Sequence, residues 1–210
     1  MDIDPKTRTL DETYKLLTGM IVPRPVAWIT SLSANGTVNL APFSAYGLVT
    51  HSPPMLMVTI GKRDGERKDT GRNIVERREF VVNVARYADA VMLHDSSVDL
   101  AYGESEISHL GLETVPSVAV AVPRLATSEA AMECRLREKL EYPDVDSIVL
   151  LSDVVSFHVR DGLIRSGKID TRELDPLARI GGPNYAGLGR FVGLSPPSRR
   201  PLDGGVRDSE

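Results

Sequence analysis

Two cationic side chains, together with a group of hydroxyl and amide side chains, gather in two short segments of this sequence. The segment RPVAWITS contributes Arg24, Thr30 and Ser31, and the segment KDTGRN contributes Lys68, Asp69, Thr70 and Asn73. Charge-assisted hydrogen bonds hold phosphate groups strongly, and the first turn of a helix adds backbone N–H donors. Because residues 68–78 are expected to start a helix near Asp69 or Thr70, this spacing indicates a phosphate site. The alternative is that Asp69 or Thr70 only caps the helix and Lys68 is solvated.

The segment NLAPFS, residues 39–44, offers a second type of contact. Pro42 has no N–H, so we expect the strand that contains it to end or bulge there. Backbone groups of four residues would then be free to face a ligand: Leu40, Ala41, Phe43 and Ser44. A flat heterocycle with an imide edge could use them, while Pro42 and Phe43 cover its apolar surface. The alternative is an ordinary strand end.

Composition and motif spacing exclude several other classes of protein. Asp and Glu outnumber Lys and Arg by 29 to 25, and a net charge of −4 argues against nucleic-acid binding. The single Cys134 excludes an intrachain disulfide and a multi-cysteine metal site, and the four histidines are scattered, so we expect no metal site. Residues 187–193 and 61–70 lack the spacing of a dinucleotide-binding motif and of a P-loop. No residue is singled out as catalytic, although a set assembled in space would escape this test.

The N-terminus MDIDPKTRTL is acidic and polar, unlike a secretory signal. No apolar run approaches the roughly 18 residues of a membrane helix. We therefore expect a cytoplasmic protein that does not contact a membrane.

Strand and turn signals dominate the chain. Residues 26–32 and 37–43 flank an Asn-Gly turn and are expected to form a β-hairpin after the extended PRP at residues 23–25. Further strands are expected at residues 53–61, 79–85, 131–142 and from 147 to about 164. Helices are expected from the capping box at Thr9 and Glu12 to about Thr18, from Asp69 or Thr70 onward, and as short helices at 87–97 and near 108–111.

The strand expected at residues 131–142 alternates strictly in polarity. One predicted face carries Met132, Cys134, Leu136, Leu140 and Tyr142. The other predicted face carries Glu133, Arg135, Arg137, Lys139 and Glu141. This pattern is typical of a strand with one face in water.

Six or more strands joined mostly by hairpins favour an antiparallel barrel over a doubly wound parallel sheet. The length fits one domain, expected over residues 1–194. Residues 195–210 are rich in Pro, Gly and charge, and we expect them to form a tail.

Four of these segments together resemble a known family. RPVAWITSLSANGTVNLAPFSAY, PPMLMVTIG, KDTGRNI and EFVVNV, in this order, are similar to the flavin reductase-like family with an FMN-binding split barrel. This family includes flavoredoxins and the reductase components of two-component monooxygenases. The resemblance runs from about residue 10 to about residue 192. The sequence departs from it at His51 and Ser52, before a proline pair.

The resemblance implies a Greek-key split β-barrel that forms a homodimer, with FMN bound near the subunit interface. It implies that Thr30, Ser31, Lys68 and Thr70 hold the phosphate and ribityl chain. It places five residues along the flavin ring: Asn39, Ala41, Pro42, Phe43 and Ser44. Arg24, Asp69 and Asn73 match the pattern too, as cofactor contacts or as residues that order the loops. Similarity of LARIGGPNYAGLGRF to a C-terminal element of the family puts Arg179 and Tyr185 near the flavin rim.

The function implied is that of an NAD(P)H-dependent flavin reductase, in which NADH or NADPH passes a hydride to flavin N5. The acceptor of the electrons would be free flavin, oxygen or a partner monooxygenase. An FMN electron carrier without its own nicotinamide site is the first alternative, and a barrel that has lost its cofactor is the second.

Overall fold

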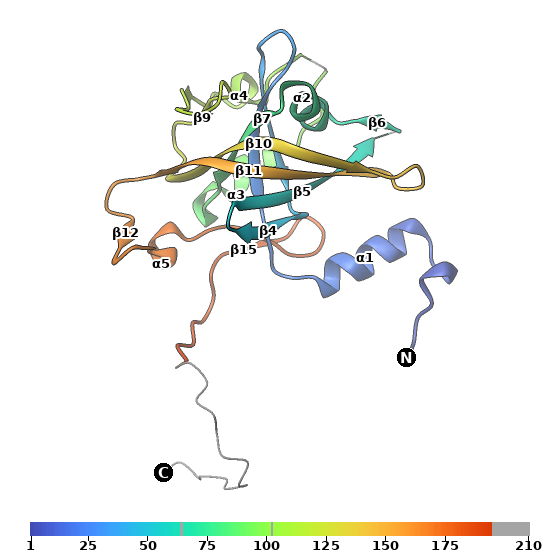
Figure 1. The fold of residues 1–210 in the computed structure, drawn as a ribbon. Coiled ribbons are helices and arrows are strands. Elements are labelled where there is room, and N and C mark those ends of the chain that lie inside the picture. The colour runs from blue at the N-terminus through green and yellow to red at the C-terminus, as the bar shows by residue number, and fades with distance from the viewer. Residues whose placement is uncertain (64, 102, 195–210) are drawn as a thin grey trace, which may run out of the picture.

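The computed structural model describes residues 1–63, 65–101 and 103–194, so the predicted tail at 195–210 lies outside the described residues. Antiparallel strands form the body of the molecule (Figure 1). The main sheet has the strand order β3-β2-β7-β10-β11-β5-β4, and β6 pairs with β5. Its strands are β2 (Ala27–Leu32), β3 (Val38–Phe43), β4 (Tyr46–His51), β5 (Pro54–Arg63), β6 (Glu66–Arg67), β7 (Glu79–Val84), β10 (Ala130–Glu141) and β11 (Ser147–Val159).

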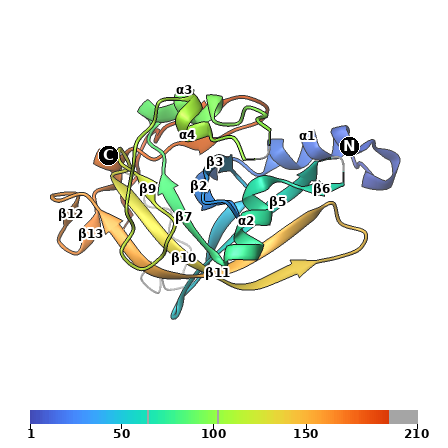
Figure 2. The ribbon, with the colours of Figure 1, turned by 90° about the horizontal axis from the view of Figure 1, so that it is seen from above.

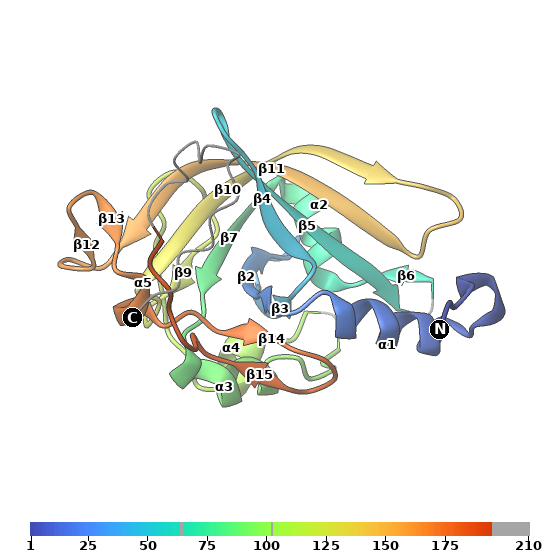
Figure 3. The same ribbon diagram turned by 90° about the horizontal axis from the view of Figure 1, so that it is seen from below.

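Three small sheets complete the strands. They are β1 (Arg24–Pro25) with β14 (Ala178–Arg179) and β15 (Tyr185–Ala186), β8 (Thr114–Val115) with β9 (Arg124–Leu125), and β12 (Ile164–Arg165) with β13 (Lys168–Ile169). Figure 3 shows β14 and β15 on the side of the molecule where α3 lies. Because β3 and β4 end the main sheet without pairing with each other, the sheet is open. The prediction of a mainly β, antiparallel fold with a few short helices is confirmed.

The helices are short and lie around this sheet. They are η1 (Pro5–Thr7), α1 (Leu10–Met20), α2 (Asp69–Arg77), η2 (Tyr87–Asp89), α3 (Ala90–Asp95), α4 (Glu106–His109) and α5 (Thr171–Leu174). The β2–β3 hairpin lies between α2 on one side and α3 and α4 on the other (Figure 2). No helix of the described residues is long and apolar enough to cross a membrane.

Local signals predicted these elements well. The Thr9 hydroxyl accepts from the Glu12 N–H and the Glu12 carboxylate accepts from the Thr9 N–H, which confirms the capping box, although α1 runs to Met20. The hairpin turn is confirmed, with Gly36 at a φ of 87° that glycine adopts readily. The long strand expected to reach residue 164 ends at Val159, because the chain turns at Asp161 and Gly162.

The strict alternation predicted for residues 131–142 is wrong at Glu133, and Tyr142, predicted on the apolar face, is 56% exposed. Glu133 is only 2% exposed, because its carboxylate accepts three backbone N–H groups: those of Val118 at 3.0 Å, Ala119 at 2.6 Å and Val120 at 3.2 Å. A bulge between Glu133 and Cys134 shifts the register with β11 at this point. The loop at residues 117–121 therefore wraps around a buried anion.

The core on the α2 side of the sheet is apolar. It includes Ile29, Val58, Ile74 and Phe80. Cys134 belongs to this cluster, and burial raises the pKa of its thiol. Cys134 is therefore a core residue and not a reactive thiolate.

The helix α1 lies apart from this core. None of its residues is buried, and Leu10, Tyr14 and Leu17 lie on one face with Leu10 92% exposed. Figure 1 shows α1 extending away from the strands. Its C-terminal end is held by Arg24, whose guanidinium donates to the Thr18 and Ile21 carbonyls at 2.8 and 2.6 Å.

Candidate functional site

A pocket of about 350 Å³ lies between β3, the β5–β6 hairpin, the start of α2 and the segment after α3. Of the residues predicted for the site, seven line it: Asn39, Ala41, Pro42, Phe43, Lys68, Asp69 and Thr70. The hairpin brings residues 39–43 beside the start of α2, which the sequence spacing alone did not determine.

One end of the pocket is cationic. Lys68 is the N-cap residue of α2, and no side chain caps this helix. Neither Asp69 nor Thr70 caps α2, so that alternative is wrong. The first N–H groups of α2 donate no capping bond to a side chain and are available to a ligand. Burial and the nearby Arg63 lower the pKa of Lys68. Among the described residues, Lys68 has no ion-pair or hydrogen-bond partner, so this half-buried cation is poised for an anion.

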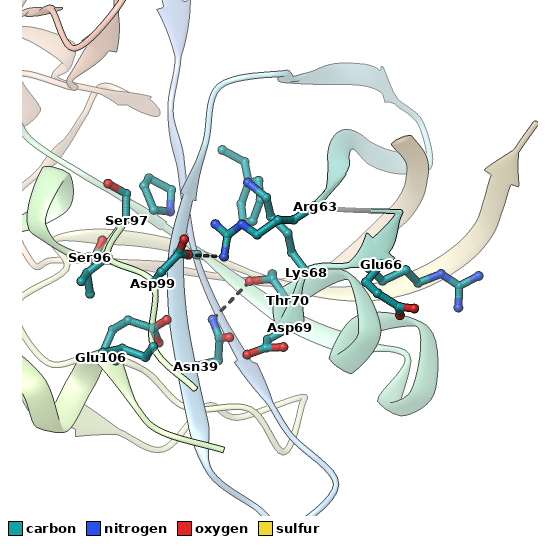
Figure 4. A pocket seen from close by; sticks show the side chains of 16 residues that line it. Asn39, Arg63, Glu66, Lys68, Asp69, Thr70, Ser96, Ser97, Asp99 and Glu106 are labelled. Carbon is teal, nitrogen blue, oxygen red and sulfur yellow. Dashed lines mark hydrogen bonds and ion pairs between the residues drawn. The ribbon is translucent and has the colours of Figure 1, made fainter. Parts of the chain in front are cut away.

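The mouth of the pocket is crossed by an ion pair. Arg63 at the end of β5 contacts the Asp99 carboxylate from the segment after α3 (Figure 4). Arg67 in β6 also lines the pocket, and its guanidinium donates to Glu141 at 2.8 Å. Arg63 and Arg67 add positive charge beside Lys68.

The opposite side of the pocket is formed by the outer edge of β3. The prediction that Pro42 interrupts the strand is wrong: β3 continues through it, and Trp28 and Ala27 pair with Pro42 and Phe43. The Leu40 N–H points away from β2, since it donates to the Glu106 carboxylate at 2.9 Å. By the alternation of antiparallel pairing, Pro42 has the same orientation, so its missing N–H costs no ladder bond.

Hydrogen-bond acceptors therefore dominate this edge. The outward N–H of Leu40 is already bonded to Glu106, and the outward carbonyl of Val38 accepts from the Ser105 hydroxyl. By the same alternation, the carbonyls of Leu40 and Pro42 also point outward. Glu106 is buried, and this burial raises its pKa. Of the backbone contacts predicted for residues 40–44, the structure supports an acceptor edge and not a mixed one.

Three predicted residues do not line the pocket: Thr30, Ser31 and Asn73. Ser31 and Asn73 are buried and joined by a 3.1 Å hydrogen bond from Asn73 Nδ2, and Asn39 Nδ2 donates to Thr70 Oγ1 at 3.2 Å. Thr30 is on the other face of β2, because neighbouring strand residues alternate. Its hydroxyl donates to the Pro123 carbonyl at 2.7 Å. The bonds of Ser31 and Asn39 fix the hairpin against α2, and the bond of Thr30 ties β2 to the residue before β9.

A second group of predicted residues lies outside the pocket, around β1 and β14. Arg24 pairs in register with Arg179, donates to the Ile180 carbonyl at 2.8 Å and reaches the Ser44 hydroxyl at 3.5 Å. Arg179 stacks over the ring of Tyr185 with 4.6 Å from Cζ to the ring centre. Ser44 directly follows the pocket residue Phe43, so this group borders the β3 end of the pocket.

Sequence reasoning missed the pocket residues of two segments. Arg63, Glu66 and Arg67 come shortly before the predicted residue Lys68, and no motif in the sequence marks them. Ser96, Asp99 and Glu106 follow α3, where no motif marks them. Only the raised pKa and burial of Glu106, both properties of the fold, single it out.

Comparison with known structures defines the class of the protein. Component B of nitrilotriacetate monooxygenase from Bacillus cereus is 36% identical, with a TM-score of 0.89 over 92% of this chain and 98% of its own. The 2-nitrobenzoate 2-nitroreductase NbaA of Pseudomonas fluorescens is 31% identical, with a TM-score of 0.83 over 97% and 100%. A split-barrel domain protein from Shewanella frigidimarina, 18% identical, has a TM-score of 0.82 over 93% and 98% and confirms the split-barrel fold.

The fold and these similarities support a flavin-binding oxidoreductase. Residues 19–176 match the family described as "Flavin reductase like domain". The chain belongs to this flavin reductase-like family, as its motifs indicated.

Proposed function

We propose that the protein is an FMN-binding, NAD(P)H-dependent flavin reductase that binds FMN in the pocket at the start of α2. The observation that carries this proposal is Lys68, a half-buried cation at the uncapped N-terminus of α2. It makes no hydrogen bond or ion pair among the described residues, and Asp99 acts on it only through its charge. Such a helix end, with a cation beside it, suits a phosphate group.

The donor and acceptor pattern of the pocket fits FMN. Its phosphate would lie against Lys68 and the N–H groups of α2, within reach of Arg63. The flavin ring would lie along Ala41, Pro42 and Phe43, where the outward carbonyls can accept from an imide N–H. Bound FMN would supply the hydride chemistry, with the chain providing orientation and electrostatics.

The other predicted residues act less directly in this proposal. Ser31 and Asn73 hold the β2–β3 hairpin against α2 through their hydrogen bond, and Thr30 ties the other face of β2 to the Pro123 carbonyl. Arg24, Ser44, Arg179 and Tyr185 form the border of the pocket past Phe43. There they would shape the groove that receives the nicotinamide.

Oxidised protein loaded with FMN should lose its flavin absorbance when NADH or NADPH is added without oxygen, because hydride transfer reduces the ring. The two nucleotides are compared separately, with dithionite as the control that reduces any bound flavin. A protein that dithionite bleaches but neither nucleotide does is the electron carrier, our alternative. A protein that takes up no FMN at all contradicts both readings and favours a barrel without cofactor.

We also propose a homodimer in which the apolar face of α1 is covered by the second chain. Exposure of Leu10, Tyr14 and Leu17 on one helix face supports this, because such a stripe normally packs against another surface. Sedimentation velocity should give twice the mass of the 22.9 kDa chain. Leu17→Glu should shift the protein toward monomer, while Lys15→Gln, a change at a residue paired with Asp11, should not.

The similarity to a monooxygenase component suggests a partner monooxygenase as electron acceptor, and the similarity to a nitroreductase suggests an aromatic acceptor. Localisation in the cytoplasm stays a prediction.

A further inference from the structure

The pocket is polarised along its length. Figure 4 shows Lys68 and Arg63 on one side and Glu106 on the other. The cationic side belongs to β5 and α2, and the carboxylate of Glu106 comes from the first residue of α4, beside β3. The cationic side also carries the carboxylates of Glu66, Asp69 and Asp99, and Asp99 pairs with Arg63. Of the four carboxylates that line the pocket, only Glu106 is buried.

Glu106 is held in place and is not a surface charge. It is 8% exposed, its carboxylate accepts the Leu40 N–H at 2.9 Å, and Ser105 beside it donates to the Val38 carbonyl. These contacts tie α4 to the outer edge of β3. The carboxylate cannot move away from the pocket without leaving the Leu40 N–H unpaired, which is costly for a buried donor.

Oxidised and reduced flavin differ in charge at the ring. The phosphate is anionic in both states, but reduction adds negative charge near N1 of the pyrimidine part of the ring. If the phosphate lies at Lys68, the ring lies toward Glu106. Negative charge in the reduced ring would then meet a fixed carboxylate in a poorly solvated site, where like charges repel more strongly than in water.

We propose that Glu106 makes this pocket hold oxidised FMN more tightly than reduced FMN, so that reduction promotes release of the flavin. This inference rests on the proposed function. Glu106 would discriminate between the two redox states of the flavin, a role that is separate from binding the phosphate. It also makes the reduced flavin a product that leaves, as delivery to a separate acceptor needs.

The effect should depend on the protonation of Glu106. Burial and the nearby Asp69 raise its pKa, while the Leu40 N–H, its own backbone N–H and His109 oppose that rise. Asp69 faces the pocket from α2, and His109 lies one turn along α4. Below its pKa, Glu106 is neutral, so the preference for oxidised flavin should weaken as the pH falls through that range. Reduced FMN itself gains protons on acidification, so the pH dependence is read only as the difference between the wild type and a variant without this carboxylate.

The test measures the dissociation constants of oxidised FMN and of dithionite-reduced FMN by anaerobic calorimetry, on the full chain. Glu106→Gln keeps an oxygen for the Leu40 N–H and removes the charge. The ratio of the reduced to the oxidised constant should fall by about five- to tenfold, as expected for loss of one nearby like charge. Midpoint potentials of bound and free FMN give the same ratio independently.

Two control variants make the result specific. Asp99→Asn removes a carboxylate paired with Arg63 at the phosphate end, so it should change both constants by the same factor. Glu113→Gln, an exposed residue outside the pocket, should change neither. If Glu106→Gln does not fold, Glu106→Met removes the same charge with a side chain of similar length.

An unchanged ratio in the folded charge-removing variant would overturn the inference, and so would an equal change of both constants. These results leave the proposed function standing, because FMN still binds. Absence of FMN binding to the wild-type protein in either redox state is a different outcome, and it would refute the proposed function itself.

Discussion

Lys68→Ala is expected to weaken FMN binding about 10- to 100-fold, the loss of one charge-assisted hydrogen bond to a phosphate. The amine is half-buried at the N-terminus of α2 and makes no hydrogen bond or ion pair in the described part of the chain, so its replacement breaks no such contact. Riboflavin, which lacks the phosphate, should bind almost equally to the wild type and to Lys68→Ala. Fluorescence titration of the two flavins measures the difference.

Lys168→Ala is the matched control, because Lys168 is an exposed lysine of β13 and does not line the pocket. It should leave both affinities unchanged. Equal weakening of FMN and riboflavin in Lys68→Ala would show that Lys68 supports the ring or the fold, and the phosphate assignment would have to be abandoned.

Glu133→Gln is expected to destabilise the protein by about 3 kcal/mol, since hydrogen bonds to a buried charged group contribute about 1.5–3 kcal/mol each. Both carboxylate oxygens accept backbone N–H groups from residues 118–120. The amide of Gln would turn an NH₂ toward at least one of these donors. For a chain of this size, we expect the thermal midpoint to fall by roughly 6–12 °C.

The comparison is with Glu138→Gln on the same strand, where the side chain is exposed. Differential scanning calorimetry should show little change for it. Hydrogen exchange should also show faster exchange at residues 118–120 in Glu133→Gln. If Glu133→Gln is as stable as the wild type, the buried carboxylate does not contribute the predicted stabilisation.

Local signals in the sequence predicted most elements because those signals act over a few residues. The capping box at Thr9 and the Asn-Gly turn before Thr37 fix φ and ψ wherever they occur. Glu133 could not be predicted in the same way. Its burial depends on a loop that is at least 13 residues away in sequence and supplies three N–H groups.

Local signals also predicted part of the candidate site. Lys68 and Thr70 could be found from a helix start, and residues 39–43 from an unusual proline in a strand. Glu106 and Asp99 could not, because they enter the pocket through tertiary packing of α4 and of the segment after α3. Thr30 and Ser31 were predicted to contact the ligand together. Neighbouring strand residues face opposite sides, however, and only Ser31 lies on the α2 side of β2.

Pro42 has a consequence beyond ligand binding, because β3 is an end strand of the main sheet. Exposed end strands are templates on which another chain can add a strand and start aggregation. Here the outward edge has no N–H donor at Pro42. The Leu40 N–H is bonded to Glu106, and the Val38 carbonyl is bonded to the Ser105 hydroxyl. A foreign β-strand would find almost no free backbone donor. The same edge that is open to a small heterocycle is thus closed to strand addition, so the pocket can stay accessible without making the protein prone to aggregation through β3.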